Sequence, residues 1–276
     1  MREMPNKKLK IMIISSKGGV GKSTISMQVI APYLYQYNGK EAINYYEFDE
    51  ENNDLLSFGD SNLTKRQKGS VSTPRLREEF TDMFLKDENA CFDIGGNKST
   101  TLVLEALEDS GMINFVDLAV IPLLEGEQDG INASIIYSVL KGMRNDLKIL
   151  FVLNRARDFE HLEYQFDNYF GDVRGFFHDK YAVKSYLVDE SSDHVALLDN
   201  DIIKYSRKFG LTIYEIAKQQ RDFVAEMIKH KEEQSKEEEL KLLSFKNYIN
   251  KSAKTYYVDV LIPIFKKLDT LFGVEK

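Results

Sequence analysis

The sequence is poor in the residues that build disulfides and soft-metal centres. It contains one cysteine, Cys91, and its four histidines show no metal-ligand spacing. A single thiol excludes a disulfide framework and a Cys-x-x-Cys metal site. It also argues against iron–sulfur carriers, which need paired cysteines. Because low cysteine use is typical of a reducing compartment, we expect a cytoplasmic protein.

A second group of absences concerns membranes and bulk charge. No apolar run approaches the ~20 residues that a membrane-spanning helix needs. The charged residues 1–8 lead directly into the first expected strand, which is unlike a secretory signal peptide. The formal net charge is −7. This charge argues against nucleic-acid binding over the whole surface but does not bear on a local patch.

The chain is long enough, with 276 residues of which 43% are hydrophobic, for one large α/β domain with an appendage. Short apolar runs alternate with helix-length segments, which predicts a mostly parallel sheet flanked by helices on both faces. We expect strands at 9–15, 42–48, 90–94, 116–121, 148–153 and 183–188, and helices at 22–37, 75–86, 98–110, 130–143, 159–169 and 212–235. Residues 59–74 are expected to form a polar surface loop.

The most informative segment is a glycine-rich stretch that follows an apolar run and precedes a helical pattern, the order that a phosphate-binding loop requires. Its glycines allow successive N–H groups to point at one anion, and the following helix adds the positive end of its dipole. We expect Lys22 to contact the β- and γ-phosphates, Ser23 to ligate Mg²⁺ and Thr24 to touch the α-phosphate. The expected nucleotide-binding residues are Lys17, Gly18, Gly19, Val20, Gly21, Lys22, Ser23 and Thr24.

The loop departs from the usual pattern at two positions. Ser16 stands where a glycine is usual, and Lys17 gives the loop a second lysine. This variant resembles the deviant Walker A box of the ParA/MinD family of P-loop ATPases, and further motifs follow in the family's order over roughly residues 8–220. The resemblance implies ATP and Mg²⁺ as ligands and a homodimer that forms with ATP. It also implies that Lys17 reaches the phosphates of the partner subunit.

An acid that ends a short apolar strand is a candidate magnesium residue. Asp93 is followed by Ile94-Gly95-Gly96, and we interpret it as the Walker B aspartate, which would hold Mg²⁺ through a water. Members of the family more often have Asp-Thr-Pro-Pro or Asp-Ser-Pro-Ala at this point. The alternative is a strand-end aspartate that caps the next helix.

A second acidic segment, Tyr45 to Asn53, resembles the family's Asp-x-Asp-Pro-Gln-Gly-Asn switch, with Glu47 in place of the first acid. The resemblance implies that Asp49 orients the attacking water and supports Mg²⁺ through a water. It also implies that Asn53 senses the partner subunit. Lys17, Lys22 and Asp49 are then the expected catalytic residues, since phosphoryl transfer needs positive charge on the oxygens and an aligned water. A solvated acidic loop is the alternative.

One residue is a candidate for hydrogen bonding to the adenine base of the nucleotide. Asn154 ends a buried strand, and an amide can pair with both the donor and the acceptor edge of adenine. MinD-like members of the family have an Asn-Arg pair at this position. An asparagine that simply begins a turn is the alternative.

After about residue 222 the strand patterns stop, so we expect a P-loop ATPase domain over 1–221 and a helical C-terminal extension over 222–276, packed on the same domain. The extension contains four lysines without an intervening acid that could neutralise DNA phosphates: Lys241, Lys246, Lys251 and Lys254. An ordinary packed helix with a solvated basic face is the alternative.

The resemblance divides into two functional hypotheses. The first is a ParA-like ATPase whose dimer binds DNA nonspecifically and drives plasmid or other DNA segregation. A ParB-like centromere-binding adaptor would then stimulate slow hydrolysis, and the protein would associate with the nucleoid. The second is a MinD-like positioning ATPase that uses the amphipathic segment 260–272 at a membrane. A scaffold that binds ATP without hydrolysing it is a third reading.

Overall fold

The computed structural model describes residues 7–48, 57–69, 76–171, 192–232 and 237–274. Seven strands in these ranges form one sheet in the order β3-β2-β4-β1-β5-β6-β7, and all neighbouring strands are parallel. The strands are β1 (Lys10–Ile13), β2 (Ile43–Phe48), β3 (Thr64–Lys68), β4 (Ala90–Ile94), β5 (Leu118–Leu123), β6 (Ile149–Ala156) and β7 (Asp193–Leu198). The predicted α/β class is confirmed, and five of the expected strands overlap β1, β2, β4, β5 and β6.

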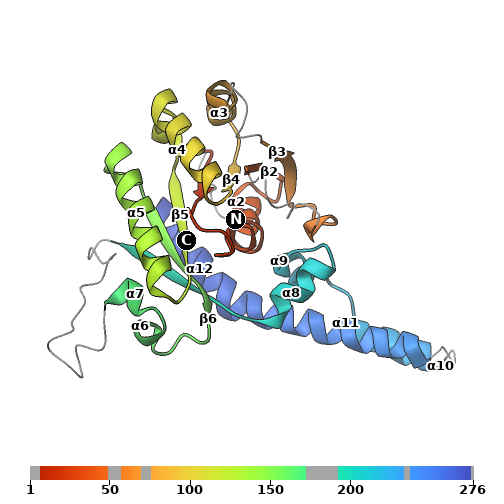
Figure 1. Cartoon of the computed structure of the whole chain (residues 1–276). Coiled ribbons are helices and arrows are strands. Elements are labelled where there is room, and N and C mark those ends of the chain that lie inside the picture. The colour runs from red at the N-terminus through yellow and green to blue at the C-terminus, as the bar shows by residue number, and fades with distance from the viewer. Residues whose placement is uncertain (1–6, 49–56, 70–75, 172–191, 233–236, 275–276) are drawn as a thin grey trace, which may run out of the picture.

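Helices cover both faces of the sheet (Figure 1). They are α1 (Lys22–Ile25), η1 (Ser26–Ile30), α2 (Ala31–Tyr37), α3 (Leu76–Leu85), α4 (Lys98–Ser110), η3 (Met112–Phe115), α5 (Glu127–Met143), α6 (Leu162–Gln165), α7 (Asp167–Phe170), α8 (Asp201–Lys208), α9 (Ile213–Lys218), α10 (Phe223–Glu232), α11 (Glu237–Tyr256), η6 (Tyr257–Leu261) and α12 (Ile262–Phe272). The α3, α4 and α5 helices contribute to one hydrophobic cluster, and α2, α8, α9, α11 and α12 contribute to the other.

The central strand shows why both faces of the sheet are covered. Successive side chains of a strand point to opposite faces. Accordingly, Ile11 and Ile13 pack in the α2–α12 cluster, whereas Met12 and Ile14 pack in the α3–α5 cluster. All four side chains are completely buried. A continuous apolar run of this kind is typical of a parallel strand that is buried on both sides.

Two helices contain a wide π turn shortly before a proline. The η1 turn lies before Pro32, and the η6 turn lies before Pro263. Proline lacks an N–H, and its ring collides with the carbonyl four residues earlier. A wider turn relieves that collision and lets the helix continue. The segment from Lys22 to Tyr37 therefore forms one continuous helical run after the glycine-rich loop, as the sequence predicts.

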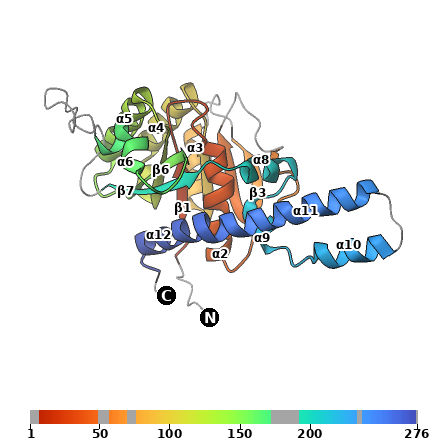
Figure 2. The ribbon, with the colours of Figure 1, turned by 90° about the horizontal axis from the view of Figure 1, so that it is seen from below.

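The C-terminal helices both pack on the sheet and extend beyond it. The α11 helix runs along the molecule, and its outer half, paired with α10, projects away from the sheet (Figure 2). Its inner half is anchored by polar contacts: Asn250 Nδ2 donates to the Ile216 carbonyl at 2.7 Å, and the Tyr256 hydroxyl donates to the Leu198 carbonyl at 2.7 Å. None of the helices among the described residues is long and apolar enough to cross a bilayer.

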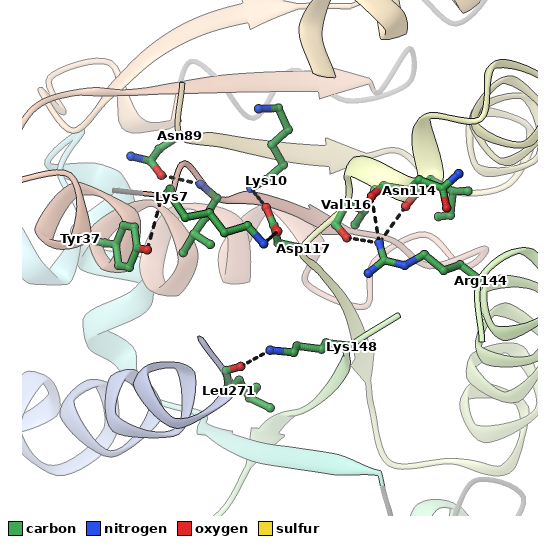
Figure 3. A network of polar contacts seen from close by, with 12 residues as sticks. Lys7, Lys10, Tyr37, Asn89, Asn114, Val116, Asp117, Arg144, Lys148 and Leu271 are labelled. Atoms are coloured by element: carbon green, nitrogen blue, oxygen red, sulfur yellow. Dashed lines mark hydrogen bonds and ion pairs between the residues drawn. The ribbon is translucent and has the colours of Figure 1, made fainter. Parts of the chain in front are cut away.

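The amino ends of the strands are held by a polar network (Figure 3). Asp117 accepts a hydrogen bond from the Lys10 backbone N–H at 2.8 Å and forms an ion pair with Lys7 Nζ at 2.6 Å. Arg144 Nη1 donates to the Val116 carbonyl at 2.7 Å, and the Asn89 side chain accepts from the backbone N–H of Leu9 at 2.8 Å. These contacts satisfy backbone groups at strand ends, so we assign the network a structural role.

Three sequence predictions need correction. Residues 64–68 are not loop but form the edge strand β3, whose exposed polar side chains gave no apolar signal. The helix expected at 212–235 is interrupted: α9 ends at Lys218 and α10 begins at Phe223. The helix expected at 159–169 is two short helices, α6 and α7. The strand expected at 183–188 lies outside the described residues.

Candidate nucleotide-binding site

The glycine-rich loop connects β1 to α1 at the carboxyl end of the central strand. Gly19 and Gly21 have φ angles of +76° and +93°, which residues with a Cβ rarely adopt. A Cβ on Gly21 would also lie 2.1 Å from Asn154 Nδ2. The loop therefore needs glycine at 21 for both its backbone conformation and its close packing, and α1 begins immediately after it.

The Lys22 side chain folds back over the loop. It is buried, and its ammonium group donates to the Lys17 carbonyl at 3.0 Å. A buried ammonium beside a glycine-rich loop at the start of a helix is suited to bind a phosphate, because its charge and the unpaired N–H groups of the first helical turn both favour an anion. Ser23 and Thr24 follow in the first turn of the helical run. Lys22, Ser23 and Thr24, to which the sequence assigned the phosphates and Mg²⁺, therefore lie together at the start of the helical run.

Lys17 has a partner within its own chain. Its Nζ lies 2.8 Å from Asp129 Oδ2, on the first turn of α5. The Lys17 side chain is 39% exposed and the Asp129 side chain 8% exposed. The second oxygen of Asp129 is buried and has no hydrogen-bond partner among the described residues. The lysine therefore lies at the surface beside the loop, and a reach toward another subunit would require this ion pair to open.

Two carboxylates meet on neighbouring strands beside the loop. Glu47 of β2 and Asp93 of β4 are register partners, and both are buried. The Tyr45 hydroxyl donates to Asp93 Oδ2 at 2.7 Å. Burial next to these acids raises the pKa of Tyr45 well above its ordinary value, so the phenol stays protonated as a donor. Because α1 and η1 pack on β4, the Asp93 strand lies next to the helix that carries Ser23.

The segment after Asp93 is tied to the phosphate-binding loop. The Asn97 N–H donates to the Ser16 carbonyl at 2.8 Å, and the Thr100 hydroxyl lies 2.9 Å from the Ser15 carbonyl. A Cβ on Gly96 would meet the backbone nitrogen of Gly18 at 3.0 Å. The close approach of the two backbones accounts for a glycine at position 96.

The carboxylates fit Mg²⁺ only in combination with a phosphate ligand. No group of three or more His, Cys, Asp or Glu side chains with metal-ligand geometry exists among the described residues. Mg²⁺ typically takes one or two carboxylates together with substrate phosphates and water. Asp93, with Ser23 on the adjoining helix, fits that pattern, and Glu47 is an additional acid at the same place. Asp49 and Asn53 lie outside the described residues, so their roles remain predictions.

Asn154 is hydrogen-bonded to the backbone of the loop. Its Nδ2 donates to the Val20 carbonyl at 2.8 Å, and its Oδ1 accepts from the Arg155 N–H at 3.0 Å. Asn154 also lines a cavity of about 790 Å³ beside the start of α1. The other lining residues are Thr24, Arg155, Asp199, Asn200, Asp201, Ile203, Lys204 and Arg207. This cavity has room for a nucleoside next to the loop, and the adenine role of Asn154 remains a prediction.

The four candidate DNA-binding lysines all lie on α11. At about 3.6 residues per turn they spread around the helix, and Lys251 and Lys254, three residues apart, point in the most similar directions. Lys241 forms an ion pair of 2.7 Å with Glu237. Lys246 lines a small cavity together with Ile216 of α9 and Phe223 of α10. Lys251 and Lys254 are exposed.

The sheet order, the loop after β1 and the two acids on neighbouring strands are the arrangement of a P-loop fold. No protein-family model matches the sequence, and no curated protein matches it.

Solved structures do match. A McdA–ATP complex from Cyanothece is 11% identical, with 76% of this chain and 91% of that one covered and a TM-score of 0.45. The MinD cell division protein of Aquifex aeolicus is 14% identical, with 77% and 91% covered and a TM-score of 0.49. A putative plasmid partition protein from Borrelia burgdorferi is 12% identical, with 74% and 97% covered and a TM-score of 0.41. MinD and plasmid partition proteins are the kinds of protein that the sequence motifs resemble. At such identities the similarity concerns the fold alone.

Sequence reasoning missed two residues of the site. Asp129, the partner of Lys17, lies on α5 far along the chain, and nothing in its local sequence marks it. Arg207 of α8 donates to Thr24 Oγ1 at 2.6 Å across 183 residues of sequence. Because both contacts depend on how distant elements pack, no local motif could have revealed them.

Proposed function

We propose that this protein is an ATPase that binds ATP·Mg²⁺ at the loop formed by Lys17–Thr24. The observation that carries the proposal is the loop itself: positive φ angles at Gly19 and Gly21, with the buried Lys22 ammonium held across the loop. Amides and an ammonium arranged in this way bind a phosphate chain, and a cavity for the nucleoside adjoins them. Two buried acids beside the loop support the presence of a cation.

The residues divide the chemistry of hydrolysis among them. Lys22 neutralises charge that develops on the transferred phosphoryl oxygens. Electrostatic stabilisation of this kind is usually the largest contribution that a protein makes to phosphoryl transfer. Mg²⁺, held by Ser23 and through water by Asp93, would supply further positive charge there. Asp49 is the proposed residue that aligns the attacking water. Lys17, released from Asp129, would contribute its charge to the nucleotide of a second subunit, so that turnover depends on dimerisation.

The cargo that we propose is DNA, in a ParA-like segregation role with a ParB-like adaptor. Support comes from the exposed lysines Lys251 and Lys254, which lie on one side of α11. The membrane alternative relies on the segment 260–272. The apolar face of that segment is already covered, because Leu261, Ile264 and Leu268 are buried in the core. Membrane binding would require α12 to leave the sheet, and this cost favours the DNA proposal.

ATPase measurements with and without double-stranded DNA test the function and the cargo together. We expect slow phosphate release by the wild-type protein, stimulation by DNA, and no turnover by Lys22→Ala. An absence of wild-type turnover under both conditions, with ATP bound, would favour the scaffold reading over the ATPase.

Binding assays with a non-hydrolysable ATP analogue separate the two cargoes. We expect a DNA gel shift that the double substitution Lys251→Glu/Lys254→Glu weakens at least tenfold, since each lost phosphate contact lowers affinity. Lys65→Glu/Lys68→Glu on the exposed edge strand β3, which changes the net charge by the same amount, is the control. Flotation with anionic liposomes and no gel shift would instead support the membrane alternative.

A further inference from the structure

Arg207 is a cation of the candidate site that neither the motifs nor the proposed mechanism uses. It lies on α8, directly after β7, and its Nη2 donates to Thr24 Oγ1 at 2.6 Å. Its guanidinium carbon lies 5.8 Å from the centroid of the Phe58 ring, which supports the side chain from one side. Its Nε is buried and has no hydrogen-bond partner among the described residues. Arg207 and Thr24 line the same cavity.

The position of α8 is fixed by buried contacts with the helix that follows the loop. Gln28, in the η1 turn, donates to the Ser206 hydroxyl at 2.7 Å and accepts from the Ile213 N–H at 2.8 Å. Gln28 and Ser206 are completely buried. Since Ser206 precedes Arg207, these bonds fix the part of α8 from which the Arg207 side chain reaches Thr24. The contact is therefore built into the packing of α8 and is not an accident of a surface side chain.

The donor and the acceptor in the bond between Arg207 and Thr24 are fixed by the chemistry of the two side chains. A guanidinium can only donate, so the Thr24 oxygen accepts, and the threonine keeps its own O–H for another partner. A hydroxyl that already accepts from a cation is a stronger donor, because such bonds polarise one another. That O–H has no acceptor among the described residues, so it can serve an anion in the cavity, and Arg207 adds a positive charge close to the same point.

We propose that Arg207 is a positioning residue for the α-phosphate of the bound nucleotide, acting through the Thr24 hydroxyl. The inference rests on the proposed nucleotide site, and it deepens that proposal by assigning α-phosphate recognition to a residue outside the loop. Lys22 serves the β- and γ-phosphates, so the two cations divide the phosphate chain between them. Arg207 therefore contributes equally to every adenine nucleotide that has an α-phosphate and contributes nothing to adenosine.

Calorimetric titration of the whole protein with ATP, ADP, AMP and adenosine tests this assignment. We expect Arg207→Ala to weaken ATP, ADP and AMP by a similar factor of about tenfold, the usual effect of losing a charge-assisted hydrogen bond. Adenosine binding should not change. Lys208→Ala is the matched control, because it removes a cation from the next, exposed position of α8. Thr24→Val should show the same ligand pattern, and the double variant should lose little more than either single one.

The outcomes distinguish this inference from the proposed function. If the wild-type protein binds none of the four compounds, the nucleotide site itself is wrong. If the wild type binds but Arg207→Ala keeps its affinity for all nucleotides, or loses adenosine equally, only the role of Arg207 is wrong. If Arg207→Ala proves unstable by thermal unfolding, the affinities of Thr24→Val for the four compounds, each relative to the wild type, take its place. Unchanged nucleotide affinities in that variant overturn the inference.

Discussion

At the scale of single residues, the site depends on backbones that approach closely. Gly21 and Gly96 both lie where a Cβ would meet another part of the site: Asn154 in one case and the Gly18 backbone in the other. The sequence reveals the first of these, because a glycine-rich loop between a strand and a helix is a known pattern. It does not explain the second, since the partner of Gly96 is 78 residues away in the chain.

Gly96→Ala tests that close approach. We expect weaker ATP binding and a loss of about 1–3 kcal/mol in the free energy of unfolding, because the new methyl group must push back the loop backbone. Titration calorimetry and urea unfolding measure the two effects. Gly142→Ala on α5 is the control, since a Cβ there has no atom within 4 Å, and alanine favours a helix. Wild-type ATP affinity in Gly96→Ala would contradict the role given to the contact.

The Lys17–Asp129 ion pair leads to a second prediction at this scale. Lys17→Ala should retain ATP binding but lose ATP-dependent dimerisation and turnover, because its charge is needed in the partner subunit. Asp129→Asn should instead dimerise at lower ATP concentration, since it releases the lysine. Sedimentation velocity with and without ATP measures both effects. A stable ATP dimer of Lys17→Ala would remove the proposed role of the lysine in the partner's site.

At the scale of elements, the buried strands and their helices could be predicted, whereas the edges could not. The strands β1, β2, β4, β5 and β6 are apolar runs, and α4 spans the expected residues 98–110. The edge strand β3 is polar and exposed, so it lacks the apolar pattern on which strand prediction relies. The break between α9 and α10 has a local mark that the prediction of one helix overlooked: Asp222 Oδ1 accepts from the N–H groups of Val224 and Ala225 and so caps α10.

The docking of α12 on the sheet gives the prediction at this scale. Leu268 is completely buried in the α2–α12 cluster. Leu268→Ala should lower the free energy of unfolding by about 2–5 kcal/mol, because it removes buried methyl groups and leaves a cavity. The exposed neighbour Lys266→Ala should change it by no more than about 0.5 kcal/mol. Equal, small effects in urea unfolding would mean that α12 is not docked, and they would revive the membrane alternative.

At the scale of the whole molecule, the fold brings residues from distant segments to one end of the sheet. The loop after β1, Asp93 at the end of β4, Asn154 at the end of β6 and Arg207 after β7 lie along one edge. Because parallel strands present their carboxyl ends together, ligands bind there in open α/β sheets. The places of the loop, Asp93 and Asn154 at the ends of strands could be predicted from sequence, since each of these strands is a recognisable apolar run. Asp129 and Arg207 could not, since only the packed helices bring them near.

The central claim is that the Lys17–Thr24 loop binds the phosphates of ATP. Isothermal titration of the wild-type protein with ATP·Mg²⁺, beside Lys22→Ala at the same concentration, tests it most directly. We predict one nucleotide bound per chain and an affinity at least tenfold lower for Lys22→Ala, because the buried ammonium supplies a charge-assisted bond to the phosphates. No binding to the wild type, or equal binding to both proteins, would contradict the claim.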